Sequence, residues 1–286
     1  YQSEAQASLA VSCNSLASYA GSLYGALTEP YPQYAAIGIR DGEDYLQLNT
    51  TLLQMENEFY GTIRPKRLIR RGERPLHALR ERGVEYVEVR CMDLDPFCSI
   101  GITAGTMRFL DVFLLHCLLS DSPPDTPEEI AGMSVNQHRV AECGRDPDLR
   151  LSRQGEKLTL AKWGGELLRE CDLIATALDE AHRSTAYNDA LSAAGAALAN
   201  PELTPSARIL RDMEQNHDKS YFHFALTQSV RHRSALLALP LATEVEARYT
   251  RMAEESLAAQ HQIEAQDTVP FEAFRQQYLS PDMLGT

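Results

Sequence analysis

Apolar and polar residues alternate along much of the first hundred residues, with the period of a β-strand. Residues 35–40 and 45–49 are two short alternating runs, and Asp41-Gly42-Glu43-Asp44 lies between them. An Asp-Gly pair between two such runs is typical of a hairpin, because glycine adopts the positive φ that the turn needs. The pattern therefore predicts a hairpin over residues 35–49.

A longer alternating run covers residues 53–66. Leu53 and Ile63 share one parity, whereas Glu56, Arg64 and Lys66 share the other. Successive side chains of a strand point to opposite faces, so one face is expected to be apolar and the other densely polar. Pro65 cannot donate to a ladder, which predicts a strand, a bend and a second strand. Residues 84–94 form the next predicted strand.

The period changes to that of a helix from Ala104 onward. Five residues share one face of this helix: Phe109, Val112, Phe113, His116 and Cys117. We interpret His116 as a core or edge residue rather than a ligand. Thr126 followed by Glu129 predicts a capped helix start. Further helices are predicted at residues 160–178, 205–213, 221–238 and 244–265.

This order of elements predicts an α+β protein, with sheet first and helices after. We expect residues 1–103 to be the sheet-forming part of one domain. Residues 104–286 are expected to form a helical region packed on the same domain. The polar stretch around residues 146–154 is interpreted as a loop.

The net charge of −13 argues against a nucleic-acid binder. Positive charge is nevertheless concentrated between Arg64 and Arg82, where eight cations face two glutamates. This basic island has two interpretations, a local anion site or a solvated loop paired with acidic neighbours. No apolar run approaches the roughly 18 residues of a membrane span.

The six cysteines form no CxxC pair and no cluster with zinc-ligand spacing. Their neighbours are mostly apolar, which favours buried free thiols in a reducing compartment. We therefore expect a cytoplasmic protein.

Glu88 and Arg90 are the strongest candidates for chemistry. They lie two residues apart on a predicted strand and so project from the same face. One interpretation is a surface ion pair of little energetic value. The other is a site in which the carboxylate holds a metal and the guanidinium grips a substrate carboxylate. The pattern alone leaves both open.

A second candidate is the segment 63–67, IRPKR, which places three cations within four residues. Arg64, Lys66 and Arg67 could neutralise a triphosphate. The sequence has no GxxxxGK[ST] and no GxGxxG, so a nucleotide would not bind through a P-loop or a Rossmann turn. Tyr60 shares parity with Arg64 and is either a pocket residue or an ordinary strand tyrosine.

Two long segments resemble the bacterial glutamate–cysteine ligases. Residues 53–67 match the form LQxENExYxxIRPKR, and residues 83–101 match GxEYxEVRxxDxxPFxxxG. Residues 108–111 (RFLD) and 206–211 (SARILR) fit further along. The match covers most of the chain and thins after Ser122. A glycine-rich stretch that some members carry is replaced here by residues 214–220.

The resemblance implies a glutamine synthetase-like fold, an antiparallel sheet curved into a half-barrel with helices around it. It also implies an ATP-dependent ligase of glutathione biosynthesis that joins L-glutamate, through γ-glutamyl phosphate, to L-cysteine. Magnesium ions would bridge protein carboxylates and phosphates. Such a transition state requires metals and cations around it, in agreement with a polar sheet face.

The resemblance also implies roles for individual residues. Glu88 matches the family's magnesium-ligand glutamate, and Arg90 matches the arginine beside it that contacts the phosphoryl region. Tyr60 and Tyr1 match tyrosines of the cysteine pocket. The basic residues of 63–67 lie in the family's basic segment, and their assignment to phosphate follows from charge and position: Arg64, Lys66 and Arg67.

The family also has an N-terminal half that carries further metal carboxylates, a histidine and arginines for glutamate, and this sequence has no such segment. Residue 1 is not a methionine, so we expect a part of a longer enzyme that is inactive alone. That missing half is therefore an expected partner. Two alternatives stay open, a related ligase with another amine acceptor and a non-catalytic fragment.

Overall fold

The computed structural model describes residue 5 and residues 9–285. Its contacts divide the chain into two compact units. The first comprises the described residues of Tyr1–Met92, Pro123–Ile130 and Ala242–Thr286, and the second comprises Asp93–Ser122 and Ala131–Leu241. The expected parts at 1–103 and 104–286 stay a prediction.

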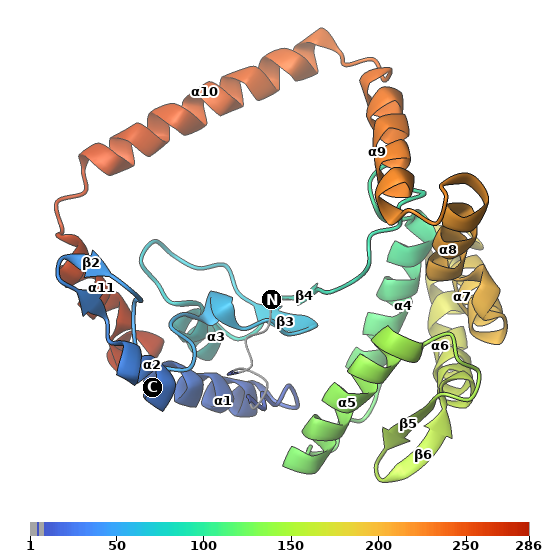
Figure 1. The fold of residues 1–286 in the computed structure, drawn as a ribbon, viewed down its shortest axis with the longest axis horizontal. Helices are drawn as coiled ribbons and strands as arrows, with labels where there is room; N and C mark the ends of the chain where they lie inside the picture. The colour runs from blue at the N-terminus through green and yellow to red at the C-terminus, as the bar shows by residue number, and fades with distance from the viewer. Residues whose placement is uncertain (1–4, 6–8, 286) are drawn as a thin grey trace. The chain divides into compact units, whose positions relative to one another are not determined.

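The first unit combines helices with two small two-stranded antiparallel sheets (Figure 1). Its elements are α1 (Leu16–Thr28), α2 (Pro32–Ile37), β1 (Arg40–Asp41), β2 (Asp44–Tyr45), η2 (Glu56–Glu58), β3 (Ile63–Lys66), α3 (Pro75–Arg82), β4 (Tyr86–Val89), α10 (Thr243–Ala265), α11 (Phe271–Leu279) and η4 (Pro281–Leu284). The two sheets are the β1–β2 hairpin and the β3–β4 pair, whose strands are joined through α3. Helix α10 has no buried residue, in agreement with its charged sequence.

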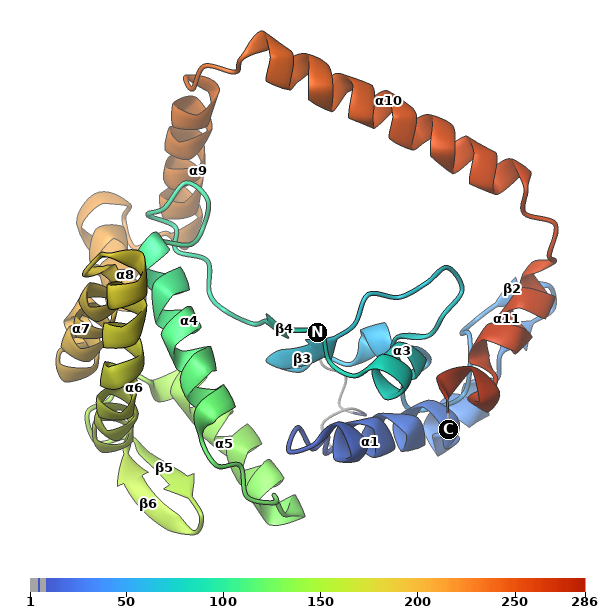
Figure 2. The same ribbon diagram turned by 180° about the vertical axis from the view of Figure 1, so that it is seen from behind.

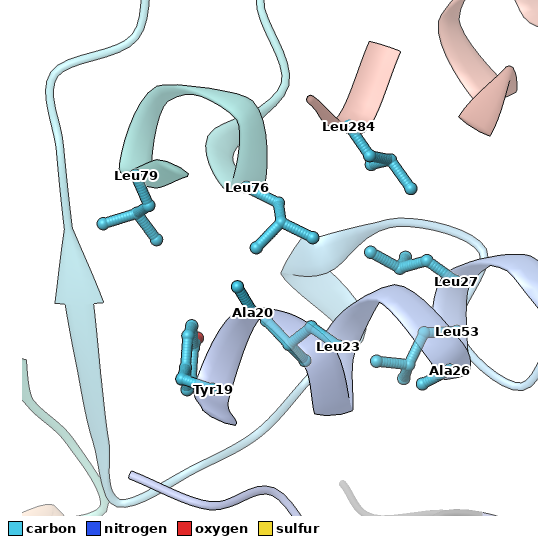
Figure 3. Packing of buried hydrophobic residues seen from close by; sticks show 9 residues of the cluster. All are labelled: Tyr19, Ala20, Leu23, Ala26, Leu27, Leu53, Leu76, Leu79 and Leu284. Atoms are coloured by element: carbon cyan, nitrogen blue, oxygen red, sulfur yellow. The ribbon is translucent and has the colours of Figure 1, made fainter. Parts of the chain in front are cut away.

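The core of this unit forms between α1 and α3 (Figure 3). Helix α1 begins after Ser15, whose hydroxyl accepts a hydrogen bond from the Ser18 backbone N–H at 3.1 Å. Its buried residues recur at spacings of one, three and four and so form a single stripe. This stripe packs against α3, η4 and the loop before η2; the cluster is Tyr19, Ala20, Leu23, Ala26, Leu27, Leu53, Leu76, Leu79 and Leu284.

Two sequence predictions in this unit were wrong in part. The hairpin turn at Gly42 is confirmed, but its strands have two residues each and Ala35–Ile37 belongs to helix α2. In the run 53–66, only Ile63–Lys66 is a strand. Leu53 is fully buried in the core and Glu56–Glu58 form a 3₁₀ turn, because Glu56 also turns inward to a buried arginine.

Pro65 does not interrupt the ladder, contrary to the prediction. It lies within β3 opposite Val87. The Arg90 backbone N–H donates to Thr62 O at 2.7 Å, so Thr62 and Arg90 are a hydrogen-bonded pair of the ladder. Such pairs alternate with non-hydrogen-bonded pairs along an antiparallel ladder, so Pro65 falls at a pair that exchanges none. Its missing N–H therefore costs no ladder bond.

The second unit is mostly helical, as the sequence predicts. Its elements are α4 (Ala104–Leu119), most of α5 (Pro127–Cys143), β5 (Arg150–Arg153), β6 (Glu156–Thr159), α6 (Leu160–His182), α7 (Ala186–Ala199), η3 (Pro201–Leu203), α8 (Pro205–Asn216) and α9 (Tyr221–Leu237). Helices α4, α6 and α7 lie side by side in both views (Figures 1 and 2). They enclose Val112, Cys171, Ala175 and Leu191. The β5–β6 hairpin occupies part of the expected loop at 146–154.

The capped start at Thr126 is confirmed. The Thr126 backbone N–H donates to the Glu129 carboxylate at 3.0 Å, and the Glu129 N–H donates to the Thr126 hydroxyl at 3.2 Å. Together these bonds form a capping box. Among the described residues, no helix combines the length and apolar character needed to cross a membrane.

Asp179 caps helix α7 from the neighbouring helix α6. Its carboxylate accepts from the backbone N–H groups of Tyr187 and Asn188, at 3.0 and 2.9 Å, and from the hydroxyl of Ser184. Burial raises its pKa, but these hydrogen bonds outweigh that effect and lower the pKa to about 2. The ionised form is thus bound more strongly in the folded state.

This shift predicts a pH dependence of stability. A lowered folded-state pKa contributes stability that is present above the unfolded pKa, near 4, and is lost as the pH falls toward 2. We expect the free energy of unfolding to decrease over that range, and Asp179→Asn to make the decrease shallower. Urea unfolding at several pH values, followed by circular dichroism, measures both. An equally steep decrease in the variant would contradict the assignment.

Candidate active site

The antiparallel pairing of β3 with β4 brings two of the sequence candidates into register. Arg64 pairs with Glu88 across the ladder, and Lys66 pairs with Tyr86. Directly opposite residues of an antiparallel pair project from the same face. The strands therefore place the cations of the IRPKR segment beside the carboxylate of the EVR segment. Arg90 follows the end of β4.

Three side chains at this site carry a buried polar atom without a hydrogen-bond partner among the described residues: Arg64 Nε, Glu88 Oε2 and Arg90 NH1. Lys66 Nζ lies 3.3 Å from Glu88 Oε2, as an ion pair without hydrogen-bond geometry. Buried charged atoms that lack a partner are costly. Because these atoms lie together, this face of the β3–β4 pair is the candidate site for a charged ligand.

The ring of Tyr60 lies against two guanidinium groups. Arg90 Cζ is 5.4 Å and Arg64 Cζ is 6.0 Å from the ring centroid. A cation near an aromatic face is attracted by the ring quadrupole. Tyr60 is 40% exposed, so it also presents surface toward solvent. Tyr60 precedes β3 and is no strand tyrosine, and its role as a pocket residue stays a prediction.

Arg64 is buried and holds the η2 turn. Its NH2 group donates to Asn57 O at 3.0 Å and to Glu56 O at 3.4 Å. Burial, and then the nearby charge of Arg90, lower its pKa. An arginine stays charged even so. Arg64 therefore adds positive charge to the site while its own hydrogen bonds stabilise the backbone beside Tyr60.

The remaining candidates are separate from this group. Arg67 Nε lies 3.7 Å from Glu85 Oε2 rather than beside Glu88. Tyr1 lies outside the described residues. The structure thus gathers Tyr60, Lys66, Glu88 and Arg90 around Arg64, and it gives Arg67 another partner.

Three cations at the end of the basic island bind other parts of the fold. Arg74 pairs with Glu56, Arg82 pairs with Glu73 at 2.6 Å, and Arg80 donates to the Leu284 carbonyl at 3.4 Å. The interpretation as a solvated loop paired with acidic neighbours is therefore wrong in part for residues 74–82: Arg74 and Arg82 do pair with glutamates, but Arg74 is buried and residues 75–82 form helix α3. The other interpretation, a local anion site, stays a prediction for the strand residues at the start of the island.

Glu56 and Arg74 are two residues that the sequence analysis did not single out. Glu56 was assigned to the polar face of a strand, yet it is 7% exposed, and Arg74 is 1% exposed. The alternating pattern concealed this pair.

The site fits a divalent cation only in part. Glu88 offers one carboxylate with a buried oxygen that accepts no hydrogen bond from the described residues. Hard cations take several oxygen ligands, which phosphate oxygens can supply alongside protein carboxylates. Within the described ranges, a group of three possible ligands occurs at Glu73, His77 and Glu81, where Arg82 already neutralises Glu73.

Comparison with known proteins places this geometry in a family. A family model described as glutamate-cysteine ligase matches residues 1–140. The chain is 48% identical over 275 residues to a glutamate–cysteine ligase of Azotobacter vinelandii and 44% identical over 274 residues to one of Pseudomonas entomophila. In both cases the match covers 96% of this chain and 52% of the relative.

A solved structure agrees with these relatives. The chain superposes with a TM-score of 0.89 and 32% identity on a crystal structure of glutamate–cysteine ligase from Francisella tularensis in complex with AMP. That match covers 97% of this chain and 55% of the other. The predicted α+β class is confirmed, and the chain spans about half the length of the curated relatives it matches. The chain belongs to the glutamate–cysteine ligase family.

Proposed function

We propose that the whole protein is an ATP-dependent ligase that joins the γ-carboxyl of L-glutamate to the amine of L-cysteine, the first step of glutathione biosynthesis. The observation that carries this proposal is the group of buried charged atoms on Arg64, Glu88 and Arg90 that have no hydrogen-bond partner among the described residues. Such atoms suit a ligand with several negative charges. The complex of the Francisella tularensis relative with AMP supports a nucleotide as that ligand.

In this proposal, the cationic side chains stabilise negative charge on the substrates, and the tyrosines shape the cysteine pocket. Arg90 donates to the transferred phosphoryl group and the glutamate carboxyl, which stabilises the negative charge that develops between them. Lys66 and Arg64 offset the charge of the nucleotide, with Arg67 at the edge of the same segment. Tyr60 forms a wall of the cysteine pocket, and Tyr1 is proposed as a second wall.

Glu88 would hold a magnesium ion, which supplies charge neutralisation for the phosphates when it is bound. Lys66 lies 3.3 Å from the same carboxylate oxygen, so it would have to move toward the phosphates as the metal binds. One carboxylate is too few for a hard cation. The chain alone is therefore proposed to be inactive, with the segment that the relatives carry beyond the match as its partner.

We also place the protein in the cytoplasm. All six cysteines are free in the structure, but the predicted burial of the thiols was wrong, because only Cys171 is buried. Accessible free thiols persist in a reducing compartment.

A chimera tests the function. This chain would replace the matching segment of the Azotobacter vinelandii relative, and phosphate release would be measured with Mg-ATP, glutamate and cysteine. We expect release that needs all of these, and none from the chain alone. A folded chimera that releases phosphate with another amine but not with cysteine would favour the alternative acceptor. No release with any amine would contradict ligase activity.

A further inference from the structure

Glu56 and Arg74 form a forked, buried ion pair behind the site. Arg74 Nε donates to Glu56 Oε2 at 2.9 Å, and Arg74 NH2 lies 2.8 Å from the same carboxylate. The Leu76 backbone N–H, at the start of α3, donates to Glu56 Oε1 at 3.3 Å. The carboxylate therefore has a fixed position relative to both the arginine and the first turn of the helix.

The C-terminal segment fixes Arg74 from the other side. Arg74 NH1 donates to the backbone carbonyl of Tyr278 at 2.7 Å, and its guanidinium lies 4.6 Å from the centroid of the Tyr278 ring. Leu284 is buried in the core against α1 and α3, which anchors this segment nearby. The Arg74 guanidinium thus contacts Glu56 through Nε and NH2 and the Tyr278 carbonyl through NH1. A lysine ammonium could not reproduce this planar arrangement of donors.

The η2 turn connects the Glu56–Arg74 pair to the candidate site. Glu56 begins this turn, and the carbonyls of Glu56 and Asn57 accept from Arg64 NH2. Arg64 in turn lies against the Tyr60 ring, which also contacts Arg90. A continuous series of contacts thus runs from Tyr278 through Arg74, Glu56 and Arg64 to the candidate pocket.

We propose that Arg74 is a positioning residue of this site, which fixes Arg64 and Tyr60 through Glu56 and is itself fixed by the C-terminal residues around Tyr278. The identity of the ligand in this inference, a polyphosphate, rests on the proposed function. Arg74 touches no ligand in this arrangement. Its role is to hold the turn whose carbonyls orient the Arg64 guanidinium.

The test compares Arg74→Lys with Arg82→Lys in the 286-residue chain. Arg82 is the last residue of helix α3, which begins just after Arg74, and it also forms a forked pair, with Glu73 rather than with a residue of η2. Two quantities are measured at a temperature where circular dichroism shows each variant folded. One is the affinity for inorganic pyrophosphate by calorimetry. The other is the ¹⁵N–¹H resonance of Arg64 Nε, assigned by its loss in Arg64→Lys.

We expect Arg74→Lys to weaken pyrophosphate binding about 10-fold and to shift the Arg64 resonance, because the site loses the alignment of a charge-assisted hydrogen bond. Arg82→Lys should change affinity by less than about twofold and leave the resonance in place. Tyr278→Leu removes only the ring contact and should shift the resonance in the same direction by less. This milder variant decides the question if Arg74→Lys does not fold.

Equal shifts in the Arg74 and Arg82 variants, or no shift in either, would overturn the inference. If the unmodified chain binds no pyrophosphate, the proposed ligand is wrong. The resonance alone then decides the positioning role, since it reports the orientation of Arg64 without any ligand.

Discussion

Arg90→Lys in the chimera is expected to lower kcat for cysteine-dependent phosphate release by roughly 10²–10³-fold, the usual cost of losing one well-placed donor to developing charge. Lysine keeps the positive charge but loses the planar fork that can bridge a phosphoryl and a carboxylate oxygen. Arg90 NH1 is buried and donates to none of the described residues, so its replacement removes no hydrogen bond of that group within the fold. The expected loss is therefore one of rate and not of stability.

Steady-state phosphate release and thermal unfolding measure the two effects separately. Arg251→Lys is the matched control, because the Arg251 side chain is 67% exposed on α10 and its ion pair to Glu255, at 4.0 Å, is weak. That variant should retain full activity. An Arg90→Lys enzyme with unchanged kcat would show that this guanidinium does not meet the reacting groups.

The helices after residue 104 were predictable because their stripes are long and their caps are local. Helix α6 runs over 23 residues, and the box at Thr126 needs only four consecutive residues. Helix α1 was missed although its apolar stripe is clear in retrospect. The strand at 53–66 was overpredicted, since an alternating pattern cannot show that a carboxylate finds a buried arginine 18 residues away.

The site was predictable in its residue types and less so in their partners. Motif and charge pointed to Glu88, Arg90, Tyr60 and the IRPKR segment, and four of these side chains meet around Arg64. Sequence could not show that Arg64 is buried or that Arg67 pairs with Glu85, because both depend on which residues the fold brings alongside. For the same reason, the sequence could not separate the cations of the candidate site from those that pair within the fold, such as Arg74 and Arg82.

Arg74→Ala is expected to lower the free energy of unfolding by about 3–5 kcal/mol. Arg74 is 1% exposed and Glu56 is 7% exposed, so truncation leaves a carboxylate in the core without its cation. The Tyr278 carbonyl also loses its donor, which adds to the cost. Urea unfolding followed by circular dichroism gives the value.

The double variant Glu56→Met, Arg74→Met separates pairing from burial. Replacing both charges with apolar groups removes the uncompensated carboxylate, so this variant should be more stable than Arg74→Ala. Arg82→Ala serves as the control, and we expect a loss of about 1 kcal/mol or less because its partners lie near the surface. Equal losses for Arg74→Ala and Arg82→Ala would mean that burial of the Glu56–Arg74 pair is incomplete in solution. A stable double variant with weak pyrophosphate binding would show instead that the fold needs only a filled core here, while the site needs the ion pair.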